Sequence, residues 1–299
     1  FLASQKTDIL VAAISGFAGF KPIFKAISFG TDIAIANKEA LVAGGHLLMP
    51  LAKEKEVNIL PIDSEHNAIY QCMMGHRWSD VEHITLTASG GPFLAMTREE
   101  MHDIAPVKAL KHPTWNMGAK ISIDSATMMN KGLESIEAAW LFGIGREKVS
   151  AVIHPQSIIH GFVTFKDETI ISHMAPADMK VPISHALGWP ERLKIQTEKL
   201  DLTKISGLEF MEINHEQFPC YNLAHQLIGE EPCYAAALNA ANEIAVNLYL
   251  ENKLALGDIY SLCTKTVNMI EIRSLDDYQS VIDYDSFARD IARSIVLSL

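Results

Sequence analysis

The first sixty residues alternate between short apolar runs and longer segments with apolar residues at helical spacing. The runs 8–14, 33–36 and 57–62 carry few polar residues, as strands do when both faces of a parallel sheet are buried. Residues 22–29 and 41–56 lie between these runs and have the spacing of helices. This strand–helix–strand–helix–strand order predicts a doubly wound, Rossmann-like α/β layout.

The next block, roughly residues 63–188, mixes strands with loops that are rich in polar residues and glycine. Strands are predicted at 84–88, 149–153 and 161–165, and a strand at 169–173 can pair with the last of these. The pattern predicts a central α/β domain.

The last third of the chain has a different pattern. Residues 189–210 show no sustained period and are predicted to form a connector. From about residue 217 onward, apolar residues recur at helical spacing with short links between the segments, which favours an α-helical bundle. The predicted helices span residues 221–228, 233–250, 256–270 and 287–297.

The usual opening of a dinucleotide-binding fold is absent from this sequence. Such folds begin with a strand and a G-x-G-x-x-G turn, and no such turn occurs here. The segment Gly16-Phe17-Ala18-Gly19 is too short to replace it and is interpreted as a strand-to-helix turn. We therefore expect the chain to begin in the middle of a Rossmann-like domain.

Composition excludes several classes of function. The chain has 25 basic and 36 acidic residues and a net charge of −11, which argues against nucleic-acid binding because phosphate contacts dominate that affinity. No stretch of about 18 apolar residues is free of charge, so no membrane span is expected. The four cysteines form no C-x-x-C pair, which favours isolated thiols in a reducing compartment.

Two carboxylates, Asp63 and Glu65, directly follow the third apolar run, at the sheet edge where open α/β folds bind ligands. In extended backbone, residues two apart point the same way, so these side chains can converge. Converging carboxylates repel unless a cation or proton lies between them, and oxygen ligands suit Mg²⁺ or Mn²⁺. The alternative is a solvated acidic loop in which Asp63 or Ser64 caps a helix.

A second polar cluster spans residues 125–134 and leads into a predicted helix. Ser125, Asn130 and Lys131 supply a hydroxyl, an amide and an ammonium group, and Glu134 supplies a third carboxylate. A polar loop with one lysine before a helix N-terminus suits a phosphate group. Taken alone, the cluster is equally compatible with a helix cap and a surface lysine.

Five ordered motifs resemble the 1-deoxy-D-xylulose 5-phosphate reductoisomerase family. They occur in the family's order and with similar spacings, and the resemblance runs from residue 8 through the helical C-terminus. The motifs are Ala36-Asn37-Lys38-Glu39-Ala40-Leu41-Val42, Pro61 to Ile69, Thr87 to Phe93, His112 to Gly118 and Asn130-Lys131-Gly132-Leu133-Glu134, with His154-Pro155-Gln156-Ser157 and His160 in addition.

The resemblance implies a set of site residues. Asp63, Glu65 and Glu134 correspond to ligands of Mg²⁺, Mn²⁺ or Co²⁺, and Asn37, Glu39 and Gly118 to positions that hold NADPH. Trp115 and Met117 match a mobile loop over the active site. The implied substrate contacts are Lys38, Ser64, Glu65, Ser89, His112, Ser125, Asn130, Lys131 and Glu134, and the implied catalytic residues are Lys38, Glu65, Glu134 and His160. Trp115 as a core aromatic and His160 as a core histidine remain alternatives.

The implied function is NADPH-dependent isomerisation and reduction of 1-deoxy-D-xylulose 5-phosphate, a phosphorylated ketose, to 2-C-methyl-D-erythritol 4-phosphate in the non-mevalonate pathway of isoprenoid biosynthesis. A homodimer in the cytoplasm of a bacterium is expected, with a plastid not excluded. The implied domains are part of an NADPH-binding Rossmann-like domain (1–62), a metal and substrate domain (63–188), a connector (189–214) and a helical domain (215–299).

The departure from the family lies upstream, where its members carry a strand and a Gly- and Ser-rich turn that binds the NADPH phosphates. Roughly the first hundred residues of an ordinary member are expected to be missing, in keeping with a typical domain length. The chain is therefore expected to bind metal and substrate but to be impaired in hydride transfer. The alternative functions are a non-catalytic truncated fragment and a Mg²⁺-dependent phosphohydrolase.

Overall fold

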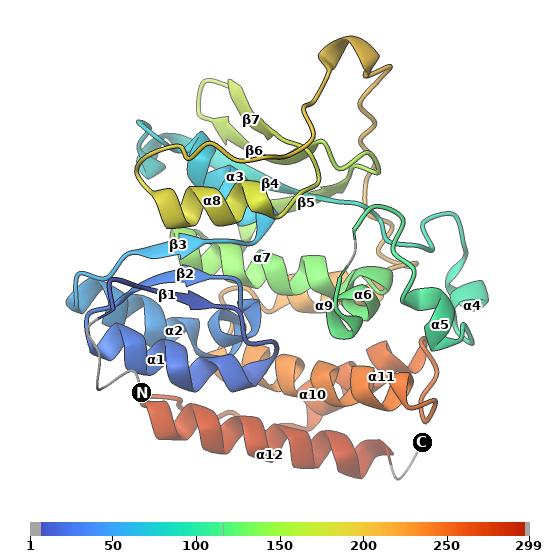
Figure 1. Ribbon diagram of the computed structural model, residues 1–299. Coiled ribbons are helices and arrows are strands. Elements are labelled where there is room, and N and C mark those ends of the chain that lie inside the picture. Colours follow the sequence, from blue (N-terminus) through green and yellow to red (C-terminus); the bar gives the residue numbers. More distant parts are fainter. Residues whose placement is uncertain (1–6, 116, 297–299) are drawn as a thin grey trace.

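A computed structural model describes residues 7–115 and 117–296. Its N-terminal unit is a parallel sheet in the order β1-β2-β3, with two helices between the strands (Figure 1). This arrangement confirms the predicted strand–helix alternation. The elements are β1 (Ile9–Ala12), η1 (Phe17–Gly19), α1 (Phe20–Ser28), β2 (Asp32–Ile35), α2 (Lys38–Glu54) and β3 (Ile59–Pro61).

The two faces of this sheet are covered by elements from different parts of the chain. Helices α1 and α2 pack on one face, and α8 (Lys180–Gly188) covers the other through Ala186, which contacts Ala34 and Leu60. The prediction that the first strand is buried on both faces was wrong. β1 is an edge strand, and the side chain of Val11 is 47% exposed.

The central sheet has the order β5-β4-β6-β7 and is mixed. Strand β4 (Val81–Ala88) is parallel to β5 (Val149–Ile153) and antiparallel to β6 (Ile159–Phe165), and β6 pairs with β7 (Ile170–Met174) as predicted. The other elements of this part are α3 (Ser64–Cys72), η2 (Trp78–Asp80), α4 (Arg98–Met101), α5 (Pro106–Ala109), α6 (Ala119–Ala126), α7 (Met129–Phe142) and η3 (Arg146–Lys148).

The predicted C-terminal helices are confirmed, and the segment before them is irregular apart from η4 (Leu202–Lys204). The helices are α9 (Pro219–Gln226), α10 (Pro232–Leu250), α11 (Asp258–Met269) and α12 (Tyr278–Val296). The last of them begins well before the predicted residue 287. Within the described residues, no helix is long and apolar enough to cross a bilayer.

The C-terminal helices complete the cores of both preceding units. Leu238 and Val246 of α10 belong to the core beneath the central sheet and α7. Ala237 on the same helix and Tyr284 on α12 belong to the core of the N-terminal sheet. The predicted domain boundaries are therefore bridged by continuous packing, and in Figure 1 α10 and α12 lie beneath both units.

Candidate active site

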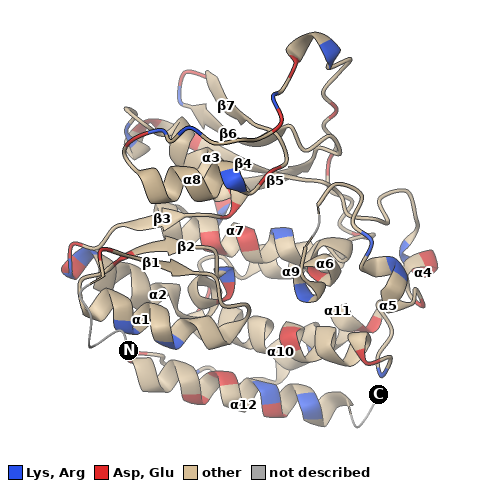
Figure 2. Ribbon diagram, in the orientation of Figure 1, with Lys and Arg blue, Asp and Glu red and all other residues tan. Residues whose placement is uncertain are grey.

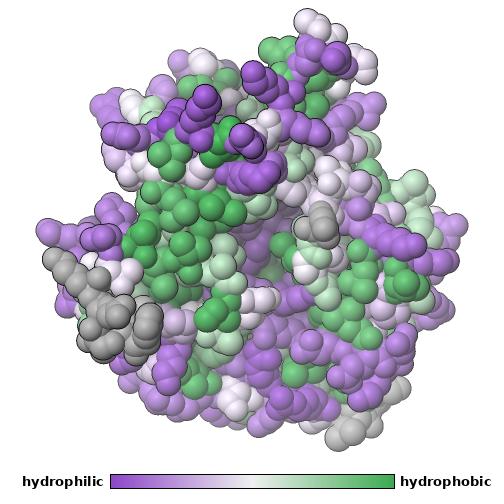
Figure 3. All heavy atoms as spheres, viewed as in Figure 1, coloured by the Kyte–Doolittle hydropathy of each residue, from purple (hydrophilic) through white to green (hydrophobic). Residues whose placement is uncertain are grey.

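The residues singled out from the sequence meet around one cavity of about 340 Å³. In Figure 3 the surface is hollowed near the centre of the view, and Figure 2 shows acidic and basic residues side by side on α7, which crosses the middle of the molecule. Every predicted site residue except Asn37 and Glu39 lines the cavity, namely Lys38, Asp63, Ser64, Glu65, Ser89, His112, Trp115, Met117, Gly118, Ser125, Asn130, Lys131, Glu134 and His160.

Three carboxylates converge in this cavity. One oxygen from each of Asp63, Glu65 and Glu134 lies within 4.8 Å of the other two. The predicted reason for convergence was wrong, because Glu65 lies in the first turn of α3 and not in extended backbone. Asp63 occupies the N-cap position of α3, but its side chain makes no capping hydrogen bond. Asp63 is therefore the N-cap residue by its backbone position, as in the capping alternative, but its carboxylate does not cap the helix.

Two lysines lie among these carboxylates. The Nζ atom of Lys38 is 2.5 Å from Asp63 Oδ2 and 3.2 Å from Glu134 Oε1, and it donates to Asn130 Oδ1 at 2.8 Å. The Nζ atom of Lys131 is 2.6 Å from Glu65 Oε1 and also contacts Glu134 Oε2. Both side chains are almost fully buried, so each ammonium group neutralises carboxylates that water cannot reach easily.

The electrostatics of this cluster fit a divalent cation. Although burial opposes ionisation, the Lys38 ammonium group holds the pKa of Asp63 below its usual range. Burial, together with the nearby Glu65 carboxylate, raises the pKa of Glu134. Three carboxylates against two lysines leave an excess of negative charge, and all the acidic ligand atoms are oxygens, which Mg²⁺ and Mn²⁺ prefer.

Asp63 also belongs to a second cluster of possible metal ligands, which it forms with His66 and Glu137. His66 and Glu137 lie within 4.8 Å of Asp63, and both are fully buried. Burial and the charge of Asp63 raise the pKa of Glu137 well above its usual value, which disfavours the ionised form that a cation would need. The Nε2 atom of His66 lies 2.8 Å from the backbone carbonyl of Glu134 and so helps to hold α7 in place.

Ser89 and His112 form a hydrogen-bonded pair at the rim of the cavity. The Nδ1 atom of His112 accepts hydrogen bonds from the backbone N–H groups of Thr114, at 3.1 Å, and Trp115, at 2.9 Å. Its proton is therefore on Nε2, which donates to Ser89 Oγ at 2.9 Å. Ser89 Oγ also accepts from the N–H of Gly91 at 3.2 Å, which leaves the hydroxyl proton of Ser89 available to a ligand.

We expect His112 to titrate below the ordinary histidine pKa of about 6.5. Burial lowers the pKa of His112 in the folded chain, so its contribution to stability is complete above about pH 6.5 and is lost as the pH falls toward the folded-state pKa. An NMR titration of the imidazole protons measures this pKa, with the resonance assigned by its loss in His112→Gln. A pKa at or above 6.5 contradicts the hydrogen-bond assignment.

The second polar cluster is more helical than predicted. Ser125 belongs to α6, and Asn130 and Lys131 lie in the first turn of α7, so the predicted polar loop is a short turn at Met128 with a φ of 59°. Gly91 packs directly against this turn. A Cβ atom at Gly91 would lie 2.7 Å from the carbonyl oxygen of Ser125, so glycine lets the loop after β4 approach α6 closely.

Trp115 and His160 lie against each other at the mouth of the cavity. Their rings are 6.2 Å apart in an edge-to-face arrangement, and Trp115 is only partly buried. His160 is 5% exposed, and its Nε2 lies 3.2 Å from the carbonyl oxygen of Ala175. His160 is therefore a buried, hydrogen-bonded histidine that also lines the cavity, and its catalytic role stays a prediction. Asn116, which follows Trp115 in the predicted loop motif, lies outside the described residues.

The residues assigned to the cofactor divide into two groups. Gly118 lines the cavity, whereas Asn37 and Glu39 are buried beside it. Asn37 Nδ2 donates to Glu39 Oε2 at 2.8 Å and to the carbonyl of Gly16 at 2.9 Å. A Cβ atom at Gly19 would lie 2.4 Å from Asn37 Oδ1, and that oxygen has no hydrogen-bond partner. A glycine turn and an amide oxygen without a partner, both at the carboxyl ends of parallel strands, fit a dinucleotide site.

Sequence reasoning assigned no role to several residues of this region. Lys120 and Asp124 form an ion pair below the cavity, and their i, i+4 spacing on a helix was the available signal. Ser157 lines the cavity from the His-Pro-Gln-Ser turn with a φ of 50°. Thr87, Ile121, Met128 and Met179 also line it, and their residue types carried no signal.

Comparison with known proteins gives consistent matches along the chain. The family model for 1-deoxy-D-xylulose 5-phosphate reductoisomerase matches residues 1–45, and two models for C-terminal domains of that enzyme match residues 59–142 and 174–291. The enzyme of this name from Chlorobaculum tepidum is 48% identical over 294 residues, which are 98% of this chain and 77% of that protein. The one from Trichlorobacter lovleyi is 46% identical, over 98% of this chain and 75% of that protein.

Solved structures give the same result. A crystal structure of DOX-P reductoisomerase in complex with NADPH, fosmidomycin and magnesium superposes with a TM-score of 0.94 at 38% identity, over 99% of this chain and 77% of that one. The reductoisomerase from Zymomonas mobilis in complex with NADPH gives a TM-score of 0.92 at 42% identity, with the same coverage.

Proposed function

This chain belongs to the 1-deoxy-D-xylulose 5-phosphate reductoisomerase family, and we propose that the cavity described above is its active site. The family resemblance found in the sequence is thereby confirmed. The activity is NADPH-dependent conversion of 1-deoxy-D-xylulose 5-phosphate to 2-C-methyl-D-erythritol 4-phosphate, with a divalent metal ion and NADPH as cofactors. The convergence of Asp63, Glu65 and Glu134 is the observation that carries the site assignment.

The three converging carboxylates would hold the metal ion. When bound, a divalent cation supplies Lewis-acid polarisation of substrate oxygens and a template for their orientation. Lys38 and Lys131 contribute to the same charge balance, because each contacts two of these carboxylates. Their ammonium groups lower the pKa of Asp63 and oppose the rise in the pKa of Glu134 that burial causes.

Polar groups that line the cavity around these carboxylates would bind the substrate. Ser89 offers a hydroxyl proton, and Lys131 offers positive charge in the first turn of α7, where helix N–H groups also favour an anion. The Asn130 amide lies next to Lys38 and Glu134. We assign substrate contacts to these residues and to Ser64, His112 and Ser125, with the phosphate on the side of Ser89. Binding energy from a phosphate remote from the reacting carbons can then assist loop closure.

Rearrangement of a ketose skeleton develops negative charge on substrate oxygens, and Lys38 is positioned to stabilise it. Its ammonium group lies between Asp63 and Asn130 at the floor of the cavity. Burial lowers the pKa of His160, which is therefore a neutral hydrogen-bonding group next to Trp115. Trp115 and Met117 would cover the substrate and exclude water. Asn37, Glu39 and Gly118 would hold NADPH, which would supply a hydride when bound.

The test of the proposed function follows two products in one reaction. With Mg²⁺ and NADPH, addition of 1-deoxy-D-xylulose 5-phosphate should oxidise NADPH, more slowly than the relatives described above because of the expected impairment in hydride transfer, and release no inorganic phosphate. Phosphate release without NADPH oxidation would support the phosphohydrolase alternative. Calorimetric titration with fosmidomycin in the presence of Mg²⁺ measures ligand binding to the cavity independently of turnover. Absence of binding would favour a non-catalytic chain.

We propose that the protein forms homodimers through the central sheet. Within the described residues β7 is an edge strand, and its alternating side chains leave Ile170 60% exposed and Met174 39% exposed. An exposed apolar edge strand is a ready site for a second copy of the chain. Sedimentation of the purified protein tests the dimer.

The relatives described above come from bacteria, which favours the bacterial cytoplasm over a plastid as the location of this protein.

A further inference from the structure

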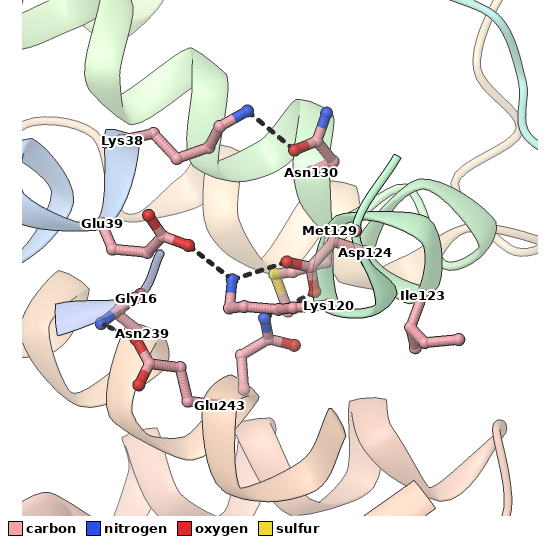
Figure 4. A network of polar contacts seen from close by, with 12 residues as sticks. Gly16, Lys38, Glu39, Lys120, Ile123, Asp124, Met129, Asn130, Asn239 and Glu243 are labelled. Atoms are coloured by element: carbon pink, nitrogen blue, oxygen red, sulfur yellow. Dashed lines mark hydrogen bonds and ion pairs between the residues drawn. The ribbon is translucent and has the colours of Figure 1, made fainter. Parts of the chain in front are cut away.

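A buried ion-pair cluster lies below the cavity, outside the residues assigned to metal or substrate. The Nζ atom of Lys120, on α6, is 2.9 Å from Glu39 Oε1 and 2.7 Å from Asp124 Oδ2. Figure 4 shows Lys120 pointing between these two carboxylates. Although burial opposes its charge, Asp124 and Glu39 raise the pKa of Lys120, so it is an ammonium ion at neutral pH. One lysine therefore neutralises carboxylates from two different helices.

One branch of this cluster leads to the cofactor side. The second oxygen of Glu39 accepts from Asn37 Nδ2 at 2.8 Å, and the same amide donates to the carbonyl of Gly16 at 2.9 Å. Asn37 packs against Gly19. An unbroken series of polar contacts thus runs from Lys120 to the turn that follows β1.

The other branch reaches the same turn through α10. Asp124 Oδ1 accepts from Asn242 Nδ2 at 2.7 Å, and the next residue, Glu243, accepts from the backbone N–H of Phe17 at 2.7 Å. The turn after β1 is therefore held from two sides. Lys120 is the cation where the two branches meet.

Lys120 is also close in sequence to Trp115 and Met117, which belong to the loop proposed to cover the substrate (the covering loop). Helix α6 begins at Ala119, immediately after Gly118, and the preceding residues Trp115 and Met117 line the cavity. We propose that Lys120 is a positioning residue that fixes the start of α6, and with it the end of the covering loop, against Asn37 and Glu39 on the cofactor side. The identity of the cofactor in this inference rests on the proposed function, whereas the restraint on α6 does not.

The test compares Lys120→Met with Lys120→Arg, which keeps the charge and can reach both carboxylates. Arg289→Met is a matched control for the loss of a buried cation. Arg289 is 18% exposed, as is Lys120, and it bridges two carboxylates at 2.7 Å, those of Asp285 and of Glu243 at the far end of the second branch, so its loss leaves both ion pairs of Lys120 in place. Three quantities are measured: hydrogen exchange of residues 117–126 without ligands, the NADPH Kd by fluorescence, and the Mg²⁺ Kd by calorimetry.

In Lys120→Met we expect hydrogen exchange at the start of α6 to be at least about tenfold faster, because an unpaired buried charge favours local opening. The NADPH Kd should rise by about tenfold, whereas the Mg²⁺ Kd should be unchanged. Lys120→Arg should restore both affected values to within about threefold. Arg289→Met should destabilise the chain without faster exchange at α6.

Unchanged exchange in Lys120→Met, or equal acceleration in Arg289→Met, would overturn the inference. If Lys120→Met does not fold, Glu39→Gln removes one of the two ion pairs and should accelerate the same amides to a smaller extent. Should the unmodified chain fail to bind NADPH, the cofactor assignment of the proposed function fails, and the exchange comparison still decides the role of Lys120.

Discussion

Replacement of Glu134 by glutamine is expected to weaken Mg²⁺ or Mn²⁺ binding by at least about tenfold, because loss of even a supporting partner of a metal ligand has an effect of that size. The variant removes one of three convergent carboxylates and keeps the shape of the side chain. Lys38 and Lys131 then face fewer negative charges, which disfavours a further cation. Calorimetric titration with each metal measures the Kd.

Glu137→Gln is the matched control for this experiment. Glu137 lies one turn further along α7, is fully buried like Glu134, and belongs to the second cluster of possible metal ligands around Asp63. Because burial and the charge of Asp63 raise the pKa of Glu137 and so disfavour its ionised form, the amide should leave metal affinity within about threefold of the original. Loss of affinity in Glu137→Gln and not in Glu134→Gln would move the metal site to the second cluster.

Lys131→Met should destabilise the metal-free protein by roughly 3–5 kcal/mol, the typical result of leaving a buried charge without its partner. Lys131 and Glu134 are almost fully buried, and Glu65 is 15% exposed, so water offers little compensation. A divalent cation between the same carboxylates replaces the missing charge. Added Mg²⁺ should therefore raise the Tm of Lys131→Met by more than it raises the Tm of the unmodified chain.

Lys148→Met serves as the comparison, since Lys148 is a partly buried lysine whose Nζ donates to the carbonyl of Val81 at 3.0 Å. Its Tm should show the same Mg²⁺ dependence as the unmodified chain. Thermal unfolding at several Mg²⁺ concentrations provides the comparison. Equal Mg²⁺ shifts in the Lys131 and Lys148 variants would mean that Lys131 does not share its carboxylates with a metal.

Much of the fold was readable because apolar burial leaves a pattern in the sequence. The run 33–36 became β2, which is buried against α1 on one side and α8 on the other. Helix α10 was predicted within one residue at its N-terminus, since alanine and leucine recur along its buried side.

Helix α3 was predicted only as the alternative in which Asp63 or Ser64 caps a helix, because three of its six buried residues are polar. His66, Asn67 and Gln71 are all buried, and each makes at least one hydrogen bond, although His66 Nδ1 and Gln71 Oε1 have no partner. Asn67 Nδ2, for example, donates to the carbonyl of Pro61. A pattern of apolar residues cannot reveal a helix of this kind. The start of α12 was missed for a related reason, since Asp283 and Asp285 interrupt its apolar spacing.

In the candidate site, single residues could be predicted from the sequence, whereas their pairings could not. Asp63 and Glu65 were found because they follow a strand, and Glu134 because a family motif contains it. The pairing of Lys38 with Asp63 and of Lys120 with Glu39 joins residues 25 and 81 positions apart, and no local pattern encodes such pairs. Only the folded chain shows which ammonium group neutralises which carboxylate.

The packing of α10 and α12 against the N-terminal sheet has a consequence for synthesis on the ribosome. Phe20 of α1 stacks on Tyr278 of α12, and the N–H of Phe17 finds its acceptor on Glu243, 226 residues later. After leaving the exit tunnel, η1 and α1 therefore lack these partners until α10 and α12 have been translated. At roughly 5–20 residues per second, this delay lasts on the order of ten seconds or more, during which the apolar residues of these elements are exposed and prone to aggregation.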